Sequence, residues 1–317
     1  MSANPLLNNH GVPAFEIIRT EHIEPAVEVM LAQAEADFEA LLKQHTPTWE
    51  GLIEPLDRIE LAMQETWGPV GHLHGVKNSD ALRAVYEKML PKLVAADLKF
   101  SQDRTIFAAL KQLRSSSAWK SLRPVQQRCV QKRIRDAELA GVGLEGEKKA
   151  RFNQIAERLS HCQTRFSNHV LDATKAFSLI LRTPEDAAGL PQHALELAAQ
   201  SYNQAHPNQA TATPDQGPWR ITLDFPSFGP FMQYCQNRAH RETVYKAYIN
   251  RASEGEINNQ ELIFEILRLR QEKAELLGFE NYAALSLASK MANQTQDIYD
   301  LLTQLQQAAL PKSRVEL

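Results

Sequence analysis

The stretch IEPAVEVMLAQAEADFEALLKQ, residues Ile23–Gln44, carries the pattern that decides the fold. Its apolar residues recur at steps of three and four, which places them on one face of a helix. Pro25 falls in the first helical turn, where a proline is tolerated because that amide has no partner within the helix. The segment therefore predicts an amphipathic helix, and its apolar face comprises Val27, Met30, Leu31, Ala34, Phe38, Leu41 and Leu42.

The same helical period continues along most of the chain. Polar caps and prolines indicate where each further helix begins, and glycines such as Gly278 indicate where helices end. The sequence therefore predicts a mainly α-helical protein. Further helices are expected to begin near Thr48, after the Asn78–Asp80 cap, near Asp103, at Pro124, at Glu147, at Phe231, at Arg241, at Gln260 and at Thr295.

The period changes at two short runs, Lys175–Arg182 and Trp219–Phe225. Both alternate and are rich in β-forming residues, so we expect two strands. Two strands in a helical chain must satisfy each other's backbone groups, which predicts one small antiparallel pair. Short helices and a long loop are expected between them. We expect three regions: a helical domain over 1–174, the β pair with its insertion over 175–226, and a second helical region over 227–317.

Composition narrows the class of protein. The chain has 317 residues, of which 43% are hydrophobic and 23% charged, and its net charge is −3. This balance gives no reason to expect nucleic acid or an anionic membrane as a partner. Cys129, Cys162 and Cys235 are odd in number and widely spaced, which favours reduced thiols over disulfides. We also find neither a signal peptide nor an apolar run near the ~18 residues of a membrane span, so we expect a cytoplasmic protein.

The segment His72-Leu73-His74 is the first candidate for a metal site. A His-x-His pair can share an ion on a strand, whereas on a helix the two rings point roughly 200° apart. The stripe from Ile59 through Trp67 to Leu73 favours a helix, with Pro69 as a possible kink. We therefore expect Leu73 to face the core, with surface or hydrogen-bonded histidines on either side of it, and we assign no metal ligand here.

The pair His161-Cys162 is the second candidate, for a nucleophilic thiol. Neighbouring helical residues point about 100° apart, so the two side chains do not meet. We expect a buried cysteine beside an exposed histidine. No glycine-rich phosphate loop, G-x-S-x-G or CxxC motif occurs, and the mixed charges are typical of solvated helix faces. The residues alone therefore identify no catalytic or metal-binding residue, and substrate-binding residues stay unassigned.

Several longer stretches carry a resemblance to a known family. They are RETVYKAYINRAS (Arg241–Ser253), ILRLRQEKAELLGFENYAALSLASKMA (Ile266–Ala292), NPLLNNHGVPAFEIIRTEHIEPAV (4–27) and PVGHLHGVKNSDALRAVYEKMLP (69–91), the last with a histidine at His74 where asparagine is usual. Together they resemble the thimet-type zinc oligopeptidases over nearly the whole chain. The segment around Leu277-Gly278-Phe279 and Tyr282 is the most specific.

The resemblance implies a cytoplasmic, monomeric metallopeptidase that cleaves short unstructured peptides inside a deep channel. The family binds zinc through His-Glu-x-x-His on a helix and a further glutamate, an arrangement that puts both imidazoles on one face. This chain contains no His-Glu dipeptide and no two histidines four apart. We therefore expect the N-terminal wall of such a channel, a parent enzyme whose zinc ligands are absent from this chain, and a chain that is inactive alone.

The final segment supports the same expectation. From Thr295 it places Ile298, Leu301, Leu302 and Leu305 on one helical face, and no closing glycine follows Pro311. We expect a sequence that is cut rather than finished, with a frayed or self-associating last helix. The alternative, left open here, is a stand-alone helical module that binds peptides or a partner protein without catalysis.

Overall fold

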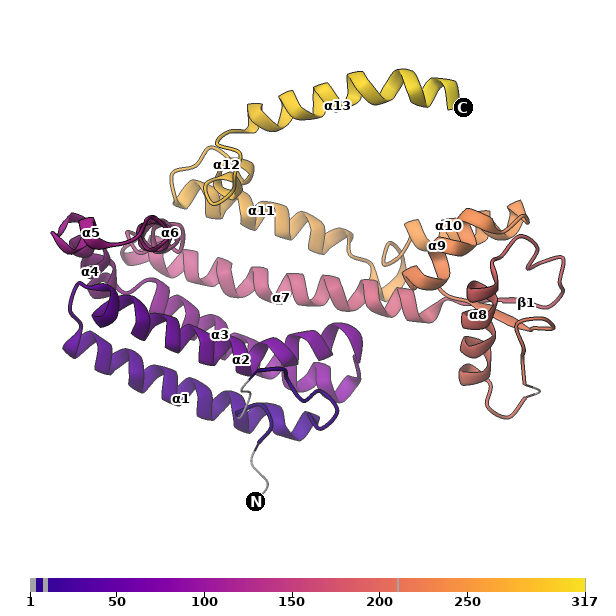
Figure 1. Cartoon of the computed structure of the whole chain (residues 1–317), viewed down its shortest axis with the longest axis horizontal. Coiled ribbons are helices and arrows are strands. Elements are labelled where there is room, and N and C mark those ends of the chain that lie inside the picture. The colour runs from indigo at the N-terminus through magenta and orange to yellow at the C-terminus, as the bar shows by residue number, and fades with distance from the viewer. Residues whose placement is uncertain (1–3, 8–10, 210, 317) are drawn as a thin grey trace. The chain divides into compact units, whose positions relative to one another are not determined.

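The computed structural model describes residues 4–7, 11–209 and 211–316. The described chain is mainly helical with a single two-stranded sheet, as the sequence predicts (Figure 1). Its elements are α1 (Thr20–Gln44), the π-helix η1 (Trp49–Ile53), α2 (Glu54–Val76), α3 (Asp80–Ser101), α4 (Arg104–Ser115), α5 (Ala118–Ser121), α6 (Pro124–Leu139), α7 (Gly146–Ala176), β1 (Leu179–Leu181), α8 (Gln192–Ala205), β2 (Trp219–Ile221), α9 (Phe225–Tyr234), α10 (Arg238–Ile249), the 3-10 helix η2 (Gly255–Ile257), α11 (Gln260–Leu276), α12 (Tyr282–Leu287) and α13 (Thr295–Glu316).

The chain forms two compact units. Unit 1 comprises Met1–His161 and Leu269–Leu317, and unit 2 comprises Cys162–Arg268. Helices α7 and α11 each begin in one unit and end in the other. No helix in the described part of the chain is long and apolar enough to cross a membrane.

Unit 1 is built on α1, α2 and α3, which pack against one another (Figure 1). The predicted apolar face of α1 is buried, with Val27 fully covered and Phe38 1% exposed. By contrast, Val29 lies on the opposite face and is 54% exposed. Leu31 and Leu42 flank the stripe and are partly buried against the core. Periodicity alone therefore assigned the buried face of this helix.

A row of ion pairs joins α1 to α3. Lys88 contacts Glu24 at 2.5 Å, Lys92 contacts Glu28 at 2.8 Å, and Lys99 contacts Glu35. Each pair is separated by the same 64 residues, so the two helices run parallel in constant register. The hydrogen bond between Lys92 and Glu28 raises the pKa of the lysine and lowers that of the glutamate. All six side chains are at least one-third exposed, so each contact contributes little by itself.

The predicted helix caps act as expected. The side chains of Thr48, Ser79 and Asp103 accept hydrogen bonds from the amides of Gly51, Leu82 and Ile106, respectively. The first turn after Thr48 is a π-helix rather than an α-helix. Pro69 does not end α2, which continues to Val76.

The glycine-rich stretch after α6 also terminates its helix as expected. Gly141 adopts a positive φ of 85°, a conformation that side-chain-bearing residues rarely adopt. A Cβ at this position would meet Leu144 at 3.0 Å and the ring of Phe152 at 3.4 Å. Glycine therefore lets the chain reverse closely against α7.

Unit 2 contains the predicted antiparallel pair. Strand β1 pairs with β2 so that Leu179 faces Ile221 and Leu181 faces Trp219. Trp219 is 2% exposed, and its indole nitrogen donates to the Pro214 carbonyl at 3.0 Å. The strands are shorter than predicted because Lys175 still belongs to α7 and Phe225 already belongs to α9.

Two helix starts differ from the sequence prediction, and two short helices were not predicted. Helix α9 begins at Phe225, not at Phe231, because Pro226 occupies its first turn instead of preceding it. Helix α10 begins at Arg238, where the Asn237 side chain caps it by accepting from the His240 amide. The short helices α5 and α12 were not predicted, since four and six residues are too few to show a helical period.

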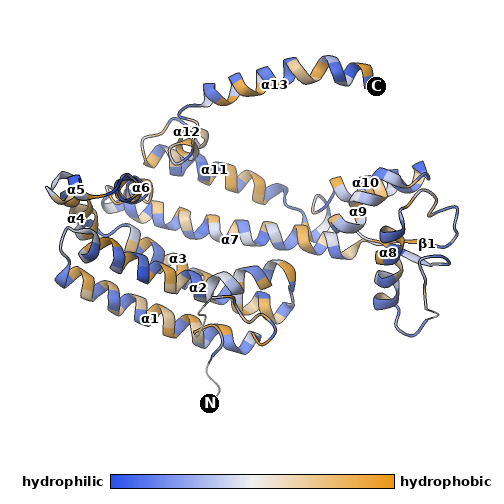
Figure 2. Cartoon of the chain, in the orientation of Figure 1, coloured by the Kyte–Doolittle hydropathy of each residue, from blue (hydrophilic) through white to orange (hydrophobic). Residues whose placement is uncertain are grey.

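Helix α13 matches its predicted start and apolar face. Pro311 lies within the helix and does not end it. No described residue of α13 is buried. The apolar residues that Figure 2 shows along this helix are largely exposed, with Leu301 at 56%, Leu302 at 54% and Leu305 at 57%. Unit 1 therefore presents an uncovered apolar helix.

Candidate functional site

The two histidines of the His-x-His segment lie on α2 and do not converge. His72 is exposed and its ring lies 5.1 Å from that of Phe15. His74 is half-buried and stacks on Tyr86 with a centroid distance of 4.1 Å. Leu73 between them is 9% exposed, as a helix predicts. The two imidazoles therefore pack against different aromatic rings.

The surroundings of the His74 ring differ at its two nitrogens. We expected a surface or hydrogen-bonded ring, and the ring is partly exposed, while its Nε2 atom is buried and has no hydrogen-bond partner among the described residues. Burial, followed by the charge of Arg83, lowers the pKa of His74. The stacking surface of Tyr86, supplied by α3, could not be foreseen from α2 alone.

A zinc site requires at least three protein ligands. The described part of the chain contains no group of three or more His, Cys, Asp or Glu side chains placed to hold a metal ion. The residues present therefore do not fit the zinc that the family implies, and we derive no step through it. The pair His161-Cys162 is arranged as predicted, with an exposed histidine beside a fully buried cysteine.

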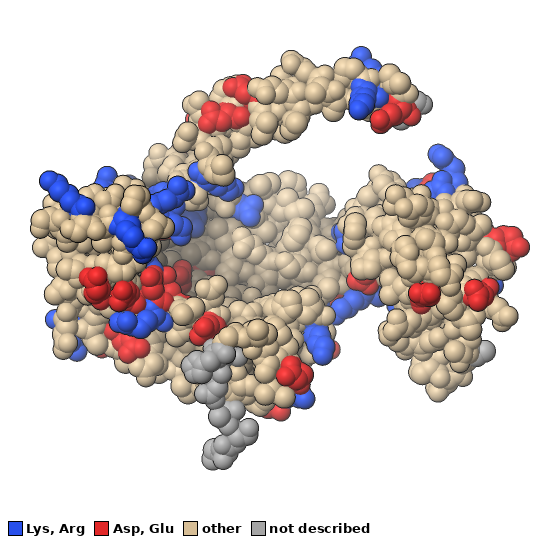
Figure 3. Space-filling view, viewed as in Figure 1, with Lys and Arg blue, Asp and Glu red and all other residues tan. Residues whose placement is uncertain are grey.

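The candidate binding site is instead a pair of open cavities in unit 1. Figure 3 shows acidic and basic side chains close together on this face of unit 1. Asp97 and Ser101 of α3 line both. The first cavity, of about 320 Å³, lies among α1, α2, α3, α4 and α6. The second, of about 310 Å³, has mostly apolar walls formed by Leu93, Val94, Leu98, Ala140, Phe152 and Ala156.

The first cavity contains a tightly bound arginine. Arg133 of α6 is 16% exposed and donates to both carboxylate oxygens of Glu60, at 2.6 and 2.9 Å, and to Asp57. Burial disfavours the charged guanidinium, but the hydrogen bonds and charges of Glu60 and Asp57 outweigh it and raise the pKa of Arg133. These contacts of Arg133 therefore link α6 to α2.

The second cavity is lined by one acidic and one basic side chain, Asp97 and Lys273, and neither forms a bidentate ion pair like that of Arg133. Asp97 keeps access to solvent, yet the surrounding atoms desolvate its carboxylate and, with Glu60, raise its pKa. Lys273 of α11 is half-buried, and this burial lowers its pKa although Asp97 opposes the shift. The Lys273 ammonium lies 5.0 Å from the centroid of the Phe152 ring. Within the described chain, no direct ion pair joins Asp97 and Lys273, although the charge of each shifts the pKa of the other.

Two further contacts fix the walls of this cavity. Arg151 of α7 donates to both carboxylate oxygens of Glu272 of α11, at 2.5 and 2.7 Å. Gln102 at the end of α3 is 4% exposed and donates to the Ala140 carbonyl and to Asn153, both at 2.8 Å. The helices that carry Asp97, Phe152 and Lys273 are therefore held together by hydrogen bonds next to the cavity.

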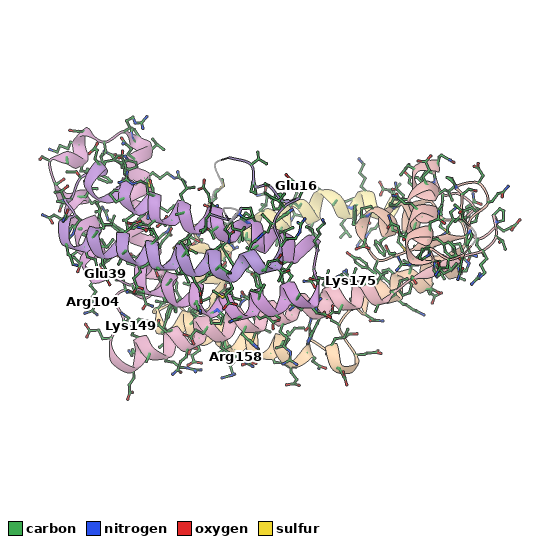
Figure 4. All side chains as sticks on the ribbon, turned by 90° about the horizontal axis from the view of Figure 1, so that it is seen from below. Glu16, Glu39, Arg104, Lys149, Arg158 and Lys175 are labelled. Atoms are coloured by element: carbon green, nitrogen blue, oxygen red, sulfur yellow. The ribbon has the colours of Figure 1, made fainter. Side chains whose placement is uncertain are left out.

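A shallower polar cavity lies nearby in unit 1. Arg104 of α4 and Lys149 of α7 line it and lie near each other in Figure 4. Arg104 pairs with Glu145 at 2.7 Å and is 56% exposed. Because its charged groups are solvated and partly paired, this cavity has the character of ordinary surface.

Unit 2 contains a separate His–Asp pair that sequence reasoning missed. His240 of α10 contacts Asp186 at 2.9 Å, and this hydrogen bond lowers the pKa of Asp186. Nearby, Cys235 is 2% exposed and its thiol lies 3.6 Å from the Asp186 carbonyl. Burial raises the pKa of Cys235, which favours the unreactive thiol. The pair therefore anchors the loop after β1 to α10.

Sequence reasoning also missed Asp97, Ser101 and Lys273 as a group. It attributed charged residues to solvated helix faces, which holds for most of them. The spacing of Asp97 and Ser101, four apart, was the available signal, because it places both on one face of α3. Lys273 lies 176 residues after Asp97, so no local pattern could connect it to them.

These features define a class: a mainly helical protein with an open, charge-lined cavity in one of its units. Comparison with known proteins identifies the family. Residues 27–149 match the family described as Neurolysin/Thimet oligopeptidase, N-terminal domain, and residues 231–317 match Peptidase family M3. Over these two segments the chain is similar to the thimet-type oligopeptidases and to peptidase family M3.

Individual relatives agree with this assignment. A probable cytosolic oligopeptidase A of Arabidopsis thaliana is 42% identical over 98% of this chain. The oligopeptidases A of Haemophilus influenzae and Escherichia coli are each 40% identical over 99% of it. The chain covers 44% of the plant protein and 46% of each bacterial one, so it spans less than half their length.

Proposed function

We propose that residues 1–317 form the N-terminal portion of an oligopeptidase A-like metallopeptidase that degrades short peptides in the cytoplasm. The observation that carries this proposal is the 40–42% identity to oligopeptidases A over 98–99% of the chain. The regions over 1–174, 175–226 and 227–317 are the proposed domains. In this proposal zinc is bound, and peptide bonds are cleaved, by residues of the remaining half of the family protein.

The exposed apolar face of helix α13 is a surface on which the remaining half of the family protein could pack. Ile298, Leu301, Leu302 and Leu305 share one helical face and are all exposed. An exposed apolar face of this kind is typical of a surface that another protein segment covers. We propose that the catalytic half of the family protein packs on α13, and that unit 1 forms one wall of the resulting peptide channel.

Complementation tests the proposal. The chain is mixed with a separately expressed C-terminal portion of Escherichia coli oligopeptidase A, with and without zinc, and a quenched fluorescent peptide is added. We expect no hydrolysis by the chain alone and measurable hydrolysis after mixing. The double substitution Leu301→Lys and Leu305→Lys should abolish the gain, whereas Lys312→Glu, a matched exposed change on α13, should leave it.

Two outcomes would contradict the proposal. Chelator-sensitive turnover by the chain alone would show that it contains an active site. Peptide binding by the chain without any activity after mixing would favour the alternative of a stand-alone, non-catalytic binding module.

A further inference from the structure

Helix α13 carries a heptad stripe that the rest of unit 1 leaves uncovered. Steps of three and four separate the residues of this stripe, which are Ile298, Leu301, Leu305, Ala308, Lys312 and Val315. This spacing is that of the a and d positions of a coiled coil, which two helices bury between them. No described residue of α13 is buried, and Val315 is 86% exposed. The stripe is therefore suited to a second helix with the same spacing.

The charges of α13 are distributed unequally along the helix. Residues 295–305 carry Asp297 and Asp300, and residues 306–316 carry Lys312, Arg314 and Glu316. All five side chains are exposed, and Figure 3 shows the acidic ones near the beginning of the helix and the basic ones near its end. Two carboxylates give the first half a net charge of −2, whereas two cations and one carboxylate give the second half +1. Two copies of α13 therefore complement each other when they run antiparallel.

One register satisfies both the stripe and the charges. Its layers, centred between residues 306 and 307, are Ile298 with Val315, Leu301 with Lys312 and Leu305 with Ala308 of the second copy. In this register the stem of Lys312 would cover Leu301, and its ammonium would lie near the carboxylates of Asp297 and Asp300. A parallel pair would place Lys312 against Lys312, which is repulsive. Antiparallel helices also align their dipoles favourably.

We propose that two copies of this chain associate through α13 as an antiparallel helix pair. Such a pair is symmetric, so the association closes at a dimer. The dimer goes beyond the proposed peptidase function, because it requires only residues of this chain. It uses the same apolar face that the proposed function assigns to the catalytic half, so a second copy and that half exclude each other.

Sedimentation equilibrium of the full chain over a range of concentrations measures the association. We expect a reversible monomer–dimer equilibrium without larger species. The double substitution Leu301→Lys and Leu305→Lys should leave the chain monomeric, because it removes two apolar layers. Thr303→Lys with Gln307→Lys adds the same two charges at the same spacing on the opposite face of α13, and this matched control should still dimerise.

Charge reversal tests the orientation. Lys312→Glu with Arg314→Glu makes both halves of α13 acidic and should weaken the dimer about ten-fold or more, with a smaller effect at high salt. Adding Asp300→Lys returns an opposite charge to the first half and should recover part of the affinity. A parallel pair would not respond in this way, since each charge would still face its own kind.

Disulfide formation tests the register. A Cys129→Ser background removes the partly exposed thiol and keeps the buried Cys162 and Cys235. In this background, a chain with Ile298→Cys is mixed with a chain with Val315→Cys and oxidised mildly. We expect the mixed disulfide to predominate, because these two positions form one layer of the antiparallel pair.

A chain that stays monomeric at its highest soluble concentration would overturn the proposal, as would equal dimerisation by the apolar-face variant and its control. Predominant disulfides between identical positions would overturn the antiparallel orientation. Circular dichroism of each variant excludes loss of helix as a cause. Because no peptidase activity is measured, failure here leaves the complementation experiment unaffected, and a dimer without complementation contradicts only the proposed function.

Discussion

At the scale of single residues, burial separates side chains that look alike in the sequence. Val27 and Val29 lie two residues apart on α1, yet the first is fully buried and the second is 54% exposed. The same contrast applies to charges. Nearby atoms and Glu60 raise the pKa of Asp97, whereas the hydrogen bond from Lys92 lowers the pKa of Glu28. The environment, not the residue type, therefore determines what each position contributes.

The valine pair gives a matched test of the core. Val27→Ala removes buried methyl groups and should lower the free energy of unfolding by about 1.5–3 kcal/mol. Val29→Ala should change it by less than about 0.5 kcal/mol, as for typical surface substitutions. Urea denaturation followed by circular dichroism measures both, and equal effects would show that α1 is not packed as described.

The raised pKa of Asp97 predicts a pH-dependent stability. Burial and Glu60 make its ionisation harder in the folded chain, while Lys273 partly compensates. A group with a raised folded pKa stabilises the fold at low pH, and this contribution is lost as pH rises through that pKa. Asp97→Asn should therefore raise the melting temperature at pH 7.

The gain in Asp97→Asn should disappear as pH falls below about 3.9, where the carboxyl is protonated in both states. Asp215→Asn, at an exposed position in unit 2, is the control and should show no such dependence. A loss of stability in Asp97→Asn at pH 7 would mean that Lys273 outweighs desolvation.

At the scale of elements, caps and periodicity account for most helices, and charge pairs align them. The three lysines on α3 and three glutamates on α1 match with a constant offset of 64 residues, which fixes the relative register of these helices. Such exposed pairs contribute little stability individually, but reversing one charge creates repulsion within the row.

Charge exchange tests this row. Lys92→Glu places a like charge against Glu28 and should lower the melting temperature slightly, with a smaller effect at high salt because exposed charges are screened. Adding Glu28→Lys restores opposite charges and should recover part of the loss. If the second substitution lowers stability further, the contact between Lys92 and Glu28 does not contribute in solution.

At the scale of the whole molecule, the similarity to the oligopeptidases has to be set beside the side chains that the described residues provide. Two segments of the sequence match models of the thimet oligopeptidase N-terminal domain and of peptidase family M3, but the described residues provide no set of zinc ligands. Because His72 and His74 pack against separate rings, they cannot chelate one ion together. The metal chemistry of the family must therefore be tested on this chain and not assumed for it.

Elemental analysis provides that test. After desalting, we expect the purified chain to contain well under one zinc per molecule. The double substitution His72→Ala and His74→Ala should leave this content unchanged. About one zinc per chain that is lost in the double variant would contradict the structure of α2.

How much the sequence determines depends on the range of the interactions. Helical period, caps and terminating glycines are local signals, so the sequence by itself determined the helical class, the buried face of α1 and the divergence of His72 and His74. The two strands were recognised from local alternation, and their pairing followed because two isolated strands must satisfy each other's backbone groups. It failed at α5, α12 and the start of α9, where elements are short or a proline can be read in two ways. The resemblance of quoted stretches identified the family for the same reason, since it rests on contiguous residues.

Only the tertiary structure decided which charges meet. Asp97, Phe152 and Lys273 come from three helices, and neither spacing nor charge pattern relates α3 to α11 across 176 residues. Sequence spacing likewise does not predict the contacts of Arg133 with Glu60, of His240 with Asp186 or of His74 with Tyr86. Burial and electrostatics depend on distances in space, and packing sets those distances only once every helix has found its neighbours.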